Sequence, residues 1–561
     1  MTHTPARPRG GQDNLRRINT MQFITASRAL GAGTGVAAGL ALALAVPALA
    51  PADEPEIARG MVFHDLNENG VHDEGEPGIE GVVISNGYDV TTTDEDGMWE
   101  LPAEGDTVIF MTKPSGYAIE TDEYNTPLFY YVHRPDGSPP GHPDAWERRQ
   151  FDGIEPTGPL PESIDFPLRE IDEPEDYNVL LFADTQPRDW EELDYVARSV
   201  IGQVREQEDV HFGMTLGDIM YDDLDLFQPF IEATSKVGVP FYGVIGNHDM
   251  NFDSLDDAYA GETYIRYYGP RTYSFNVGRV HYVGLDNIYW RGWDDDQTGN
   301  YRETFRERDM EWLRRNLEHV PEDYLVVIAT HGPIWMHHRR EGNRFAANTQ
   351  GLFDALEDRR RVLAVNGHSH LSHHRTFTEE DGWNGAGHFH QHNIVTVSGA
   401  WWSGPADSLG IPTAEQRDGT PRGYIVLEIE GNRYTPRYRG AGLPAETQMR
   451  IYPPTLHDKG ENTLLVNVFD GMMDDGEVHY AVNGGPFQRM TYSPQLDPVA
   501  ESLYAGDPPD VPGWINPVTS VHVWEAELEE GALHEGANLI EVRYRDTFDR
   551  NFRDSISFLY E

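Results

Sequence analysis

The central part of the chain alternates short apolar runs with segments whose apolar residues recur at helical spacing. The runs predict strands at residues 179–182, 244–245, 273–275, 280–286, 325–329 and 363–365. The segments between them predict helices at residues 190–206, 226–237, 306–317 and 352–359. Short runs without polar interruption are typical of parallel strands with both faces covered. This alternation therefore predicts an α/β domain in which helices cover a sheet.

Both flanks of this region show the two-residue alternation of half-exposed strands, with turn residues between them. The clearest strands lie at residues 61–63, 81–84 and 107–110 before it, and at 464–469, 477–482, 521–524 and 539–544 after it. Pro- and Glu-rich connectors at 139–161 and 171–176 lead into the central region. We expect a small all-β sandwich at 57–170, the α/β domain at 171–440 and a second all-β sandwich at 441–561.

Polar residues follow most of the predicted central strands directly. In chain order they are Asp184, Gln186, Asp218, Asn247, His248, Asp249, His331, His368 and His370. Open α/β sheets build their sites where strands end, so these side chains should converge. Singly, each residue is more typical of a turn or a satisfied core position, but chance rarely places the whole ordered set after strands. Oxygen and imidazole donors gathered at one edge can bind two divalent cations and a bridging hydroxide.

The ordered set resembles the calcineurin-like metallophosphoesterases over about residues 177–430. The resemblance implies a four-layer αββα sandwich, here flanked by the two all-β domains. It also implies that Asp218 bridges two metals. The first metal would be bound by Asp184, Gln186, Asp218 and His370, and the second by Asp218, Asn247, His331 and His368. His248 would face the phosphate outside the metal shell, oriented by Asp249.

One position departs from the commonest pattern of that family, because Gln186 stands where a histidine is usual. An amide oxygen is a harder donor than an imidazole nitrogen, which favours Mn²⁺ or iron over Zn²⁺ at that site. The expected cofactors are thus two divalent or trivalent ions among Mn²⁺, iron and Zn²⁺.

A Gly-, Pro- and Trp-rich stretch follows His370, at residues 398–404, 410–412 and 418–424. It resembles the secreted bacterial branch of the same family, which carries dedicated β-rich domains before and after the catalytic domain. The loop is long enough to form one wall of a pocket. Trp401, Trp402 and Arg422 are candidate substrate-pocket residues. The alternative is that the two tryptophans only pack under the loop.

An acidic loop in the first β domain matches the calcium-loop pattern D-x-N-x-N-G-x₅-E. Its candidate ligands are Asp65, Asn67, Asn69, the carbonyl of Val71, Asp73 and Glu76. Because strands flank the loop, it is no EF-hand, and it resembles the B-type repeats of bacterial surface adhesins. An acidic hairpin loop without an ion is the alternative.

Five histidines follow the last motif, at positions 373, 374, 388, 390 and 392. His388, His390 and His392 would share one face of a strand. A third metal site is possible here, but the interpretation we favour is that these side chains support the metal cleft or face solvent.

The net charge and the N-terminal segment limit which partners and which cellular compartment we expect. The 561 residues include 43 Lys+Arg against 94 Asp+Glu, a net charge of −51, which argues against nucleic acid and anionic membranes as partners. Such acidity suits either high salt or an ordinary acidic secreted protein. Arg16 and Arg17 precede an apolar stretch at 29–49 that ends in a small-x-small site, so residues 1–50 are predicted to be a removed signal peptide. We expect export to the periplasm or beyond, through the general or the twin-arginine route, and no transmembrane segment in the mature chain.

The sequence thus predicts an exported dinuclear-metal hydrolase of small phosphate esters, in which a metal-bridging hydroxide attacks phosphorus. Monoesters, diesters and pyrophosphates all remain open as substrates. The alternative is a non-catalytic envelope protein that uses its β domains and calcium loop for adhesion. The intact set of candidate ligands argues against this alternative.

Overall fold

The computed structural model describes residues 56–561, except residues 104, 143–149, 293–299, 340–343, 474–475, 507 and 509–510. The predicted signal peptide at residues 1–50 lies outside the described residues. Within the described part, no helix is both long and apolar enough to span a bilayer.

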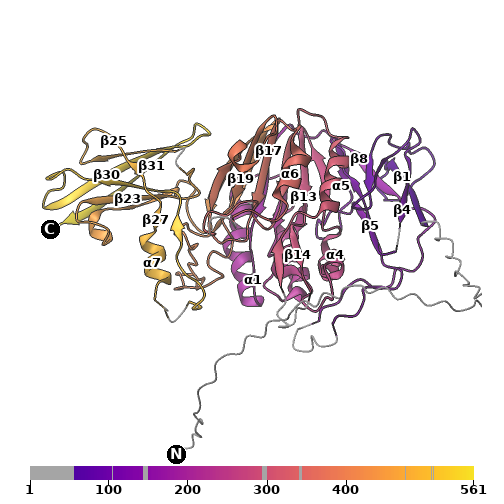
Figure 1. The fold of residues 1–561 in the computed structure, drawn as a ribbon, viewed down its shortest axis with the longest axis horizontal. Coiled ribbons are helices and arrows are strands. Elements are labelled where there is room, and N and C mark those ends of the chain that lie inside the picture. The colour runs from indigo at the N-terminus through magenta and orange to yellow at the C-terminus, as the bar shows by residue number, and fades with distance from the viewer. Residues whose placement is uncertain are drawn as a thin grey trace, which may run out of the picture. The chain divides into compact units, whose positions relative to one another are not determined.

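Two mixed sheets form the centre of the α/β domain (Figure 1). The first sheet has the order β11-β10-β9-β20-β21, with strands Phe241–Val244, Phe212–Leu216, Asp176–Phe182, Gly423–Glu430 and Arg433–Gly440. The second has the order β12-β13-β16-β17-β19-β18, with strands Tyr273–Val277, Val280–Gly284, Leu325–Ala329, Arg361–Asn366, His388–Asn393 and His373–Thr376. Strands β9, β10 and β11 are parallel, as are β13, β16, β17 and β19.

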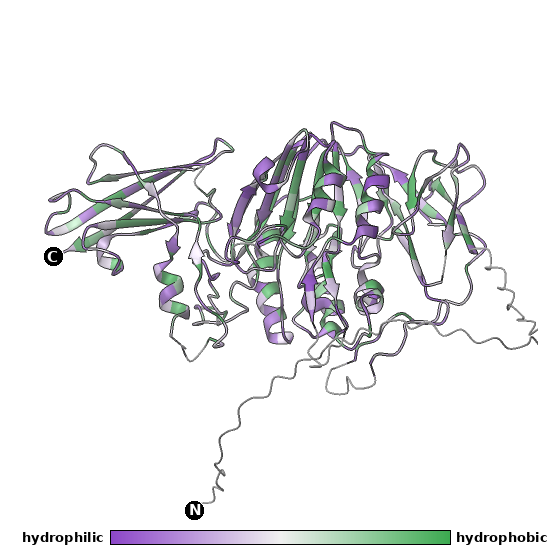
Figure 2. Cartoon of the chain, viewed as in Figure 1, coloured by the Kyte–Doolittle hydropathy of each residue, from purple (hydrophilic) through white to green (hydrophobic). Residues whose placement is uncertain are grey.

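Alternate residues of the central strands pack into two different hydrophobic cores, one on each face of the sheet. Along β9, Leu181 packs in the cluster that contains Tyr282 of the second sheet, whereas Leu180 and Phe182 pack with the helices on the other face. Those helices are α1 (Trp190–Val196), the π-helix η1 (Ala197–Ile201), α2 (Gly202–Gln207), α3 (Phe227–Thr234) and α4 (Glu262–Tyr268). Helices α5 (Glu307–Leu317) and α6 (Thr349–Leu356) contribute Trp312 and Phe353 to the core of the second sheet. The predicted order helix, sheet, sheet, helix is confirmed, and Figure 2 shows hydrophobic residues concentrated on the two sheets.

The N-terminal β domain consists of two four-stranded sheets. Their orders are β4-β1-β8-β6 and β3-β2-β5-β7. The strands are β1 Glu56–His64, β2 Val83–Ser85, β3 Val90–Thr92, β4 Met98–Ala103, β5 Thr107–Thr112, β6 Tyr117–Ile119, β7 Tyr130–His133 and β8 Phe166–Glu170. The buried ammonium of Lys113 donates to Glu173 (2.7 Å) and to the carbonyl of Asn276 (2.8 Å), which anchors this domain on strand β12.

The C-terminal domain also contains two four-stranded sheets, both antiparallel. Their orders are β22-β23-β29-β26 and β25-β24-β30-β31. The strands are β22 Met449–Tyr452, β23 Thr463–Val468, β24 Glu477–Val482, β25 Gln488–Arg489, β26 Thr491–Tyr492, β29 Val523–Glu527, β30 Gly536–Arg545 and β31 Asn551–Tyr560. Helix α7 (Pro498–Tyr504) and the short strands β27 (Gln495–Leu496) and β28 (Thr519–Ser520) complete it. Flanking β domains at both ends are therefore confirmed.

Candidate metal centre

The predicted ligands lie on loops that follow strands of both sheets. Asp184 follows β9, Asp218 follows β10 and Asn247 follows β11, while His331 follows β16 and the two remaining histidines follow β17. The backbone is left-handed at Asp184, Gln186, Asp218, His368 and His370, with φ between 39° and 73°. Such conformations are unfavourable for residues with a Cβ atom and persist where the surrounding structure imposes them, often at functional sites.

Asp218, His331 and His368 form the centre of this set, with ligand atoms that all lie within 4.8 Å of one another. Asp218 Oδ1 is 3.1 Å from His331 Nε2, which is itself 3.0 Å from His368 Nδ1. Asn247 Oδ1 lies 3.1 Å from the same His331 nitrogen. The structure thus brings together the four residues predicted for the second metal.

The other ring nitrogen of each histidine faces an oxygen atom. His331 Nδ1 lies 2.9 Å from the carbonyl of Leu216, and His370 Nδ1 lies 2.5 Å from the carbonyl of Gly399. His368 Nε2 lies 3.2 Å from a carboxylate oxygen of Glu303. If these nitrogens carry the protons, the opposite nitrogens present lone pairs to the centre, as in metal-binding histidines. The lone pairs of His331 and His368 would then face each other at 3.0 Å, an arrangement that a cation between them stabilises.

Two buried atoms on the other side of Asp218 have no hydrogen-bond partner among the described residues. They are Gln186 Oε1 and His370 Nε2. Gln186 Nε2 donates to Asp218 Oδ2 at 2.7 Å, and His370 Nε2 is 3.4 Å from Asp184 Oδ1. Buried polar atoms without partners are unfavourable, so these donors fit the first predicted cation. That Gln186 coordinates through its amide oxygen stays a prediction.

Next to this centre, the imidazole of His248 is partly exposed and paired with an acidic residue. Its Nδ1 lies 2.6 Å from Asp222 Oδ1, and its ring stacks on Tyr221 at 4.4 Å between centroids. Its backbone N–H donates to Asp218 Oδ1 (2.9 Å). Burial would lower the pKa of His248, but the charge of Asp218 and the bond to Asp222 raise it to about 9. A protonated His248 can therefore donate a proton from Nε2.

Asp249 has a different role from the one expected. Its carboxylate accepts backbone hydrogen bonds from Ile219 (3.1 Å), Met220 (2.9 Å) and Gly246 (2.8 Å). Burial and the charge of Asp218 raise its pKa to about 7. The prediction that Asp249 orients His248 is wrong, because its oxygens bind the loops after β10 and β11 while Asp222 contacts the ring.

Three sequence profiles match the chain. The profile of the calcineurin-like phosphoesterases matches residues 177–372. Those of the N-terminal and C-terminal domains of calcineurin-like phosphoesterases match residues 66–142 and 391–552. The chain is a calcineurin-like phosphoesterase. The family consists of metal-dependent phosphoester hydrolases, so the predicted family and enzyme class are confirmed. The secreted bacterial branch stays a prediction.

The phosphoesterase is also similar to solved structures. A dimetal phosphatase from Danio rerio is 14% identical, with a TM-score of 0.33, over 47% of this chain and 96% of that one. A purple acid phosphatase from yellow lupin (Lupinus luteus) is 10% identical, with a TM-score of 0.31, over 69% and 66%. A metallophosphoesterase from Sphaerobacter thermophilus is 16% identical, with a TM-score of 0.21, over 47% and 89%. No significant match was found among curated proteins.

Sequence reasoning missed two acidic residues of this phosphoesterase's site. Glu303 ends strand β15 (Tyr301–Glu303), and its carboxylate pairs with Arg339 and contacts His368. Burial opposes its ionisation, yet the contacts with His368 and Arg339 hold its pKa below the usual range. A three-residue strand has no pattern that could have revealed it. Asp222 lies shortly after Asp218 in the sequence. The next residue, Asp223, is also an aspartate, and the sequence alone gives no basis for choosing between Asp222 and Asp223.

The three candidate pocket residues separate into two groups. The ring of Trp401 stacks on His370 with centroids 3.6 Å apart and contacts Trp514. Trp402 is buried instead, and its Nε1 donates to the carbonyl of Thr185 (2.8 Å). The buried guanidinium of Arg422 lies 5.1 Å from the Trp402 ring centroid. Trp402 thus packs under the loop, which is the alternative given above for this residue. A pocket role for Arg422 stays a prediction.

Two carboxylates of the candidate calcium loop, those of Asp65 and Glu76, accept hydrogen bonds from backbone N–H groups. Asp65 accepts from the N–H groups of Glu68 (2.7 Å) and Gly70 (2.8 Å), and Glu76 accepts from those of Leu66 and Asp73 (2.9 Å each). The amide nitrogens of Asn67 and Asn69 point to Asp73 at 2.8 Å. Rotation of both amides by 180° would present their oxygens to a cation. Calcium binding here stays a prediction.

Proposed function

We propose that this phosphoesterase is an exported hydrolase of small phosphate esters that works with two metal ions. The observation behind the proposal is the convergence of buried donor atoms around Asp218, two of which, on Gln186 and His370, have no hydrogen-bond partner among the described residues. Two cations bound there would polarise phosphate oxygens and activate water for attack on phosphorus. Asp184, Gln186 and His370 would bind one, Asn247, His331 and His368 the other, and Asp218 both.

The chain's own groups supply the remaining chemistry. His248, protonated at Nε2 and oriented by Asp222 through Nδ1, would donate a proton to the leaving oxygen. Glu303 would fix the orientation of His368 through its Nε2. Trp401, stacked on His370, would form an apolar wall beside the substrate.

Charge favours small substrates over polymers. With a net charge of −51, the chain repels nucleic acids at long range, whereas a small anion can be attracted locally by the metals. Monoesters and diesters remain equal candidates. Export is supported by the signal-like pattern at residues 1–50.

The experiment compares hydrolysis of chromogenic phosphate monoesters and diesters by the chain loaded with Mn²⁺. We expect turnover that depends on metal. Asp218→Asn should abolish it and lower the metal content, because Asp218 is the carboxylate placed between both donor groups. A variant with full metal content and normal turnover would exclude this site, and an inactive wild type would favour the adhesion alternative.

A further inference from the structure

A second group of donor atoms suited to metal binding lies at the edge of the second sheet and contains none of the predicted ligands. Strands β18 and β19 are antiparallel, and their register places His374 directly opposite His392. The two rings are nearly parallel, with centroids 4.0 Å apart. Side chains at opposite positions of neighbouring strands share one face, so both imidazoles point to the same side of the sheet.

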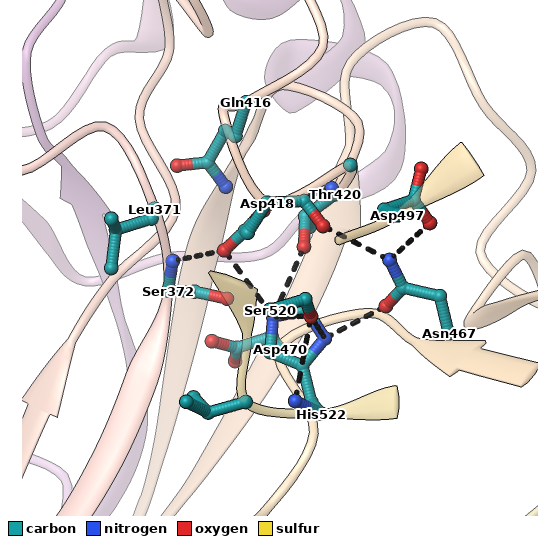
Figure 3. A network of polar contacts seen from close by, with 12 residues as sticks. Leu371, Ser372, Gln416, Asp418, Thr420, Asn467, Asp470, Asp497, Ser520 and His522 are labelled. Carbon is teal, nitrogen blue, oxygen red and sulfur yellow. Dashed lines mark hydrogen bonds and ion pairs between the residues drawn. The ribbon is translucent and has the colours of Figure 1, made fainter. Parts of the chain in front are cut away.

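The C-terminal domain brings a carboxylate to these rings. Asp470 lies just after strand β23 and has a left-handed backbone, with φ of 52°. Its Oδ1 is 2.8 Å from His392 Nε2 and 3.8 Å from His374 Nε2, and its carbonyl oxygen is 3.2 Å from His374 Nε2. The three side chains are only 1–5% exposed. Figure 3 shows Asp470 beside the polar network that contains Asp418 and His522.

We propose that His374, His392 and Asp470 bind a structural metal ion, with Zn²⁺ as the best-suited ion, which joins the edge strand of the catalytic sheet to the C-terminal domain. The proposal does not depend on the two metals of the phosphoesterase site.

The donor atoms have the number that a four-coordinate ion needs, and ligand atoms of His374, His392 and Asp470, one from each, lie within 4.8 Å of one another. Two imidazole nitrogens, one carboxylate oxygen and one carbonyl oxygen are present. Bonds of about 2.0 Å in a tetrahedral arrangement separate ligand atoms by about 3.3 Å. The measured separations of 2.8, 3.2 and 3.8 Å lie on both sides of that value. Small side-chain shifts would therefore suffice, and a mixed nitrogen and oxygen set suits Zn²⁺.

A chain of ring contacts can fix the orientation of His374. Its Nδ1 lies 3.0 Å from His390 Nε2, and His390 Nδ1 lies 2.8 Å from the hydroxyl of Tyr434. If His374 binds metal through Nε2, its Nδ1–H donates to His390, whose own Nδ1–H donates to Tyr434. Every ring nitrogen of His374 and His390 then has a partner. Such outer contacts are typical of metal-binding histidines. The histidines were expected to support the metal cleft or face solvent, yet of the strand β19 group only His388 is exposed.

Burial of the carboxylate also favours a cation. The side chains of Asp470, His374 and His392 are only 1–5% exposed. The guanidinium of Arg550 pairs with Asp546 at 2.6 Å. A buried carboxylate is paired with a cationic group or coordinates a metal ion, so this site suits a cation.

The test measures zinc directly. Wild type, His392→Gln and Asp470→Asn are loaded with Zn²⁺ and dialysed, and zinc per chain is determined by mass spectrometry. His388→Gln is the matched control, because His388 lies on the same strand but is exposed. We expect about one zinc fewer per chain in both test variants, no change in the control, and unchanged ester hydrolysis in all three. Asp470→Asn preserves side-chain shape, so it keeps the test valid if His392→Gln does not fold.

Crystals of the zinc-loaded chain provide a second readout. Anomalous diffraction at the zinc edge should show a peak between His374, His392 and Asp470, and zinc should raise the melting temperature of wild type more than that of Asp470→Asn. Equal zinc content in wild type and variants, or no anomalous peak at these residues, would overturn the proposal. The cluster would then be an ion pair in which His392 donates to Asp470.

Discussion

The pair formed by Asp222 and His248 leads to a prediction that distinguishes orientation from metal binding. We expect Asp222→Asn to lower kcat about tenfold while metal content stays at the wild-type level. The substitution keeps the shape of the side chain but removes the charge that faces His248 Nδ1 at 2.6 Å. The ring remains in place through its stacking on Tyr221, so the general acid is weakened rather than lost.

The magnitude follows from the strength and the exposure of this contact. Hydrogen bonds to charged groups contribute about 1.5–3 kcal/mol. The side chain of Asp222 is 42% exposed, so water competes for it and the lower end of that range applies. Since about 1.4 kcal/mol corresponds to a factor of ten in rate, the expected loss is about tenfold. Removal of the imidazole in His248→Ala should cost more, about 10²–10⁴-fold, the range for a positioned proton donor.

A double-mutant cycle with a chromogenic ester is the assay. In the His248→Ala background, Asp222→Asn should have no further effect, because the group that Asp222 orients is gone. Asp223→Asn is the matched control, since asparagine still caps the following turn. The reasoning is refuted if Asp222→Asn lowers kcat by the same factor with and without His248, or if it releases metal.

Three further substitutions test other parts of the molecule. Gln186→His should shift activation towards Zn²⁺, and an unchanged metal profile would mean that Gln186 does not coordinate. Glu303→Gln should weaken metal binding by about 10–100-fold in titrations, because His368 loses its charged partner; unchanged affinity would exclude that support. Asp65→Ala should abolish a calcium-dependent rise in melting temperature, worth about 1.4 kcal/mol at ten times a Kd of about 10⁻⁴–10⁻³ M, and leave turnover unchanged. A wild-type melting temperature indifferent to calcium would contradict it.

Periodicity predicted those parts of the fold in which burial determines the residue type. The apolar run at 325–329 became β16, whose five residues are all buried, because a strand between two layers has no polar face. The helix predicted at 190–206 is interrupted by the π-helix η1. The buried residues Leu193, Val196, Val200 and Val204 keep a spacing of three or four residues across η1, so the pattern of apolar residues does not reveal it.

The sequence revealed the predicted ligands because each of them follows a strand. It did not reveal the residues that support them. Glu303 reaches His368 across 65 positions, and Asp470 reaches His392 across 78. These contacts depend on how separate elements pack, and no local spacing encodes that. Trp402 illustrates the same limit: neighbouring Trp401 has the same residue type, yet one ring stacks on His370 and the other is buried under the loop.

The C-terminal domain contacts the segment that follows the predicted ligand His370. Ser372, two residues after His370, donates its backbone N–H to Asp418 Oδ2 (2.8 Å), and the same oxygen lies 3.3 Å from His522 Nε2 (Figure 3). Asn467 donates to the carbonyl of Asp418 (3.1 Å) and lies 2.7 Å from His522 Nδ1 through its own oxygen. Every one of these side chains is buried, so a broken contact would leave polar atoms without partners. The network therefore couples the position of the segment after His370 to strands of the C-terminal domain.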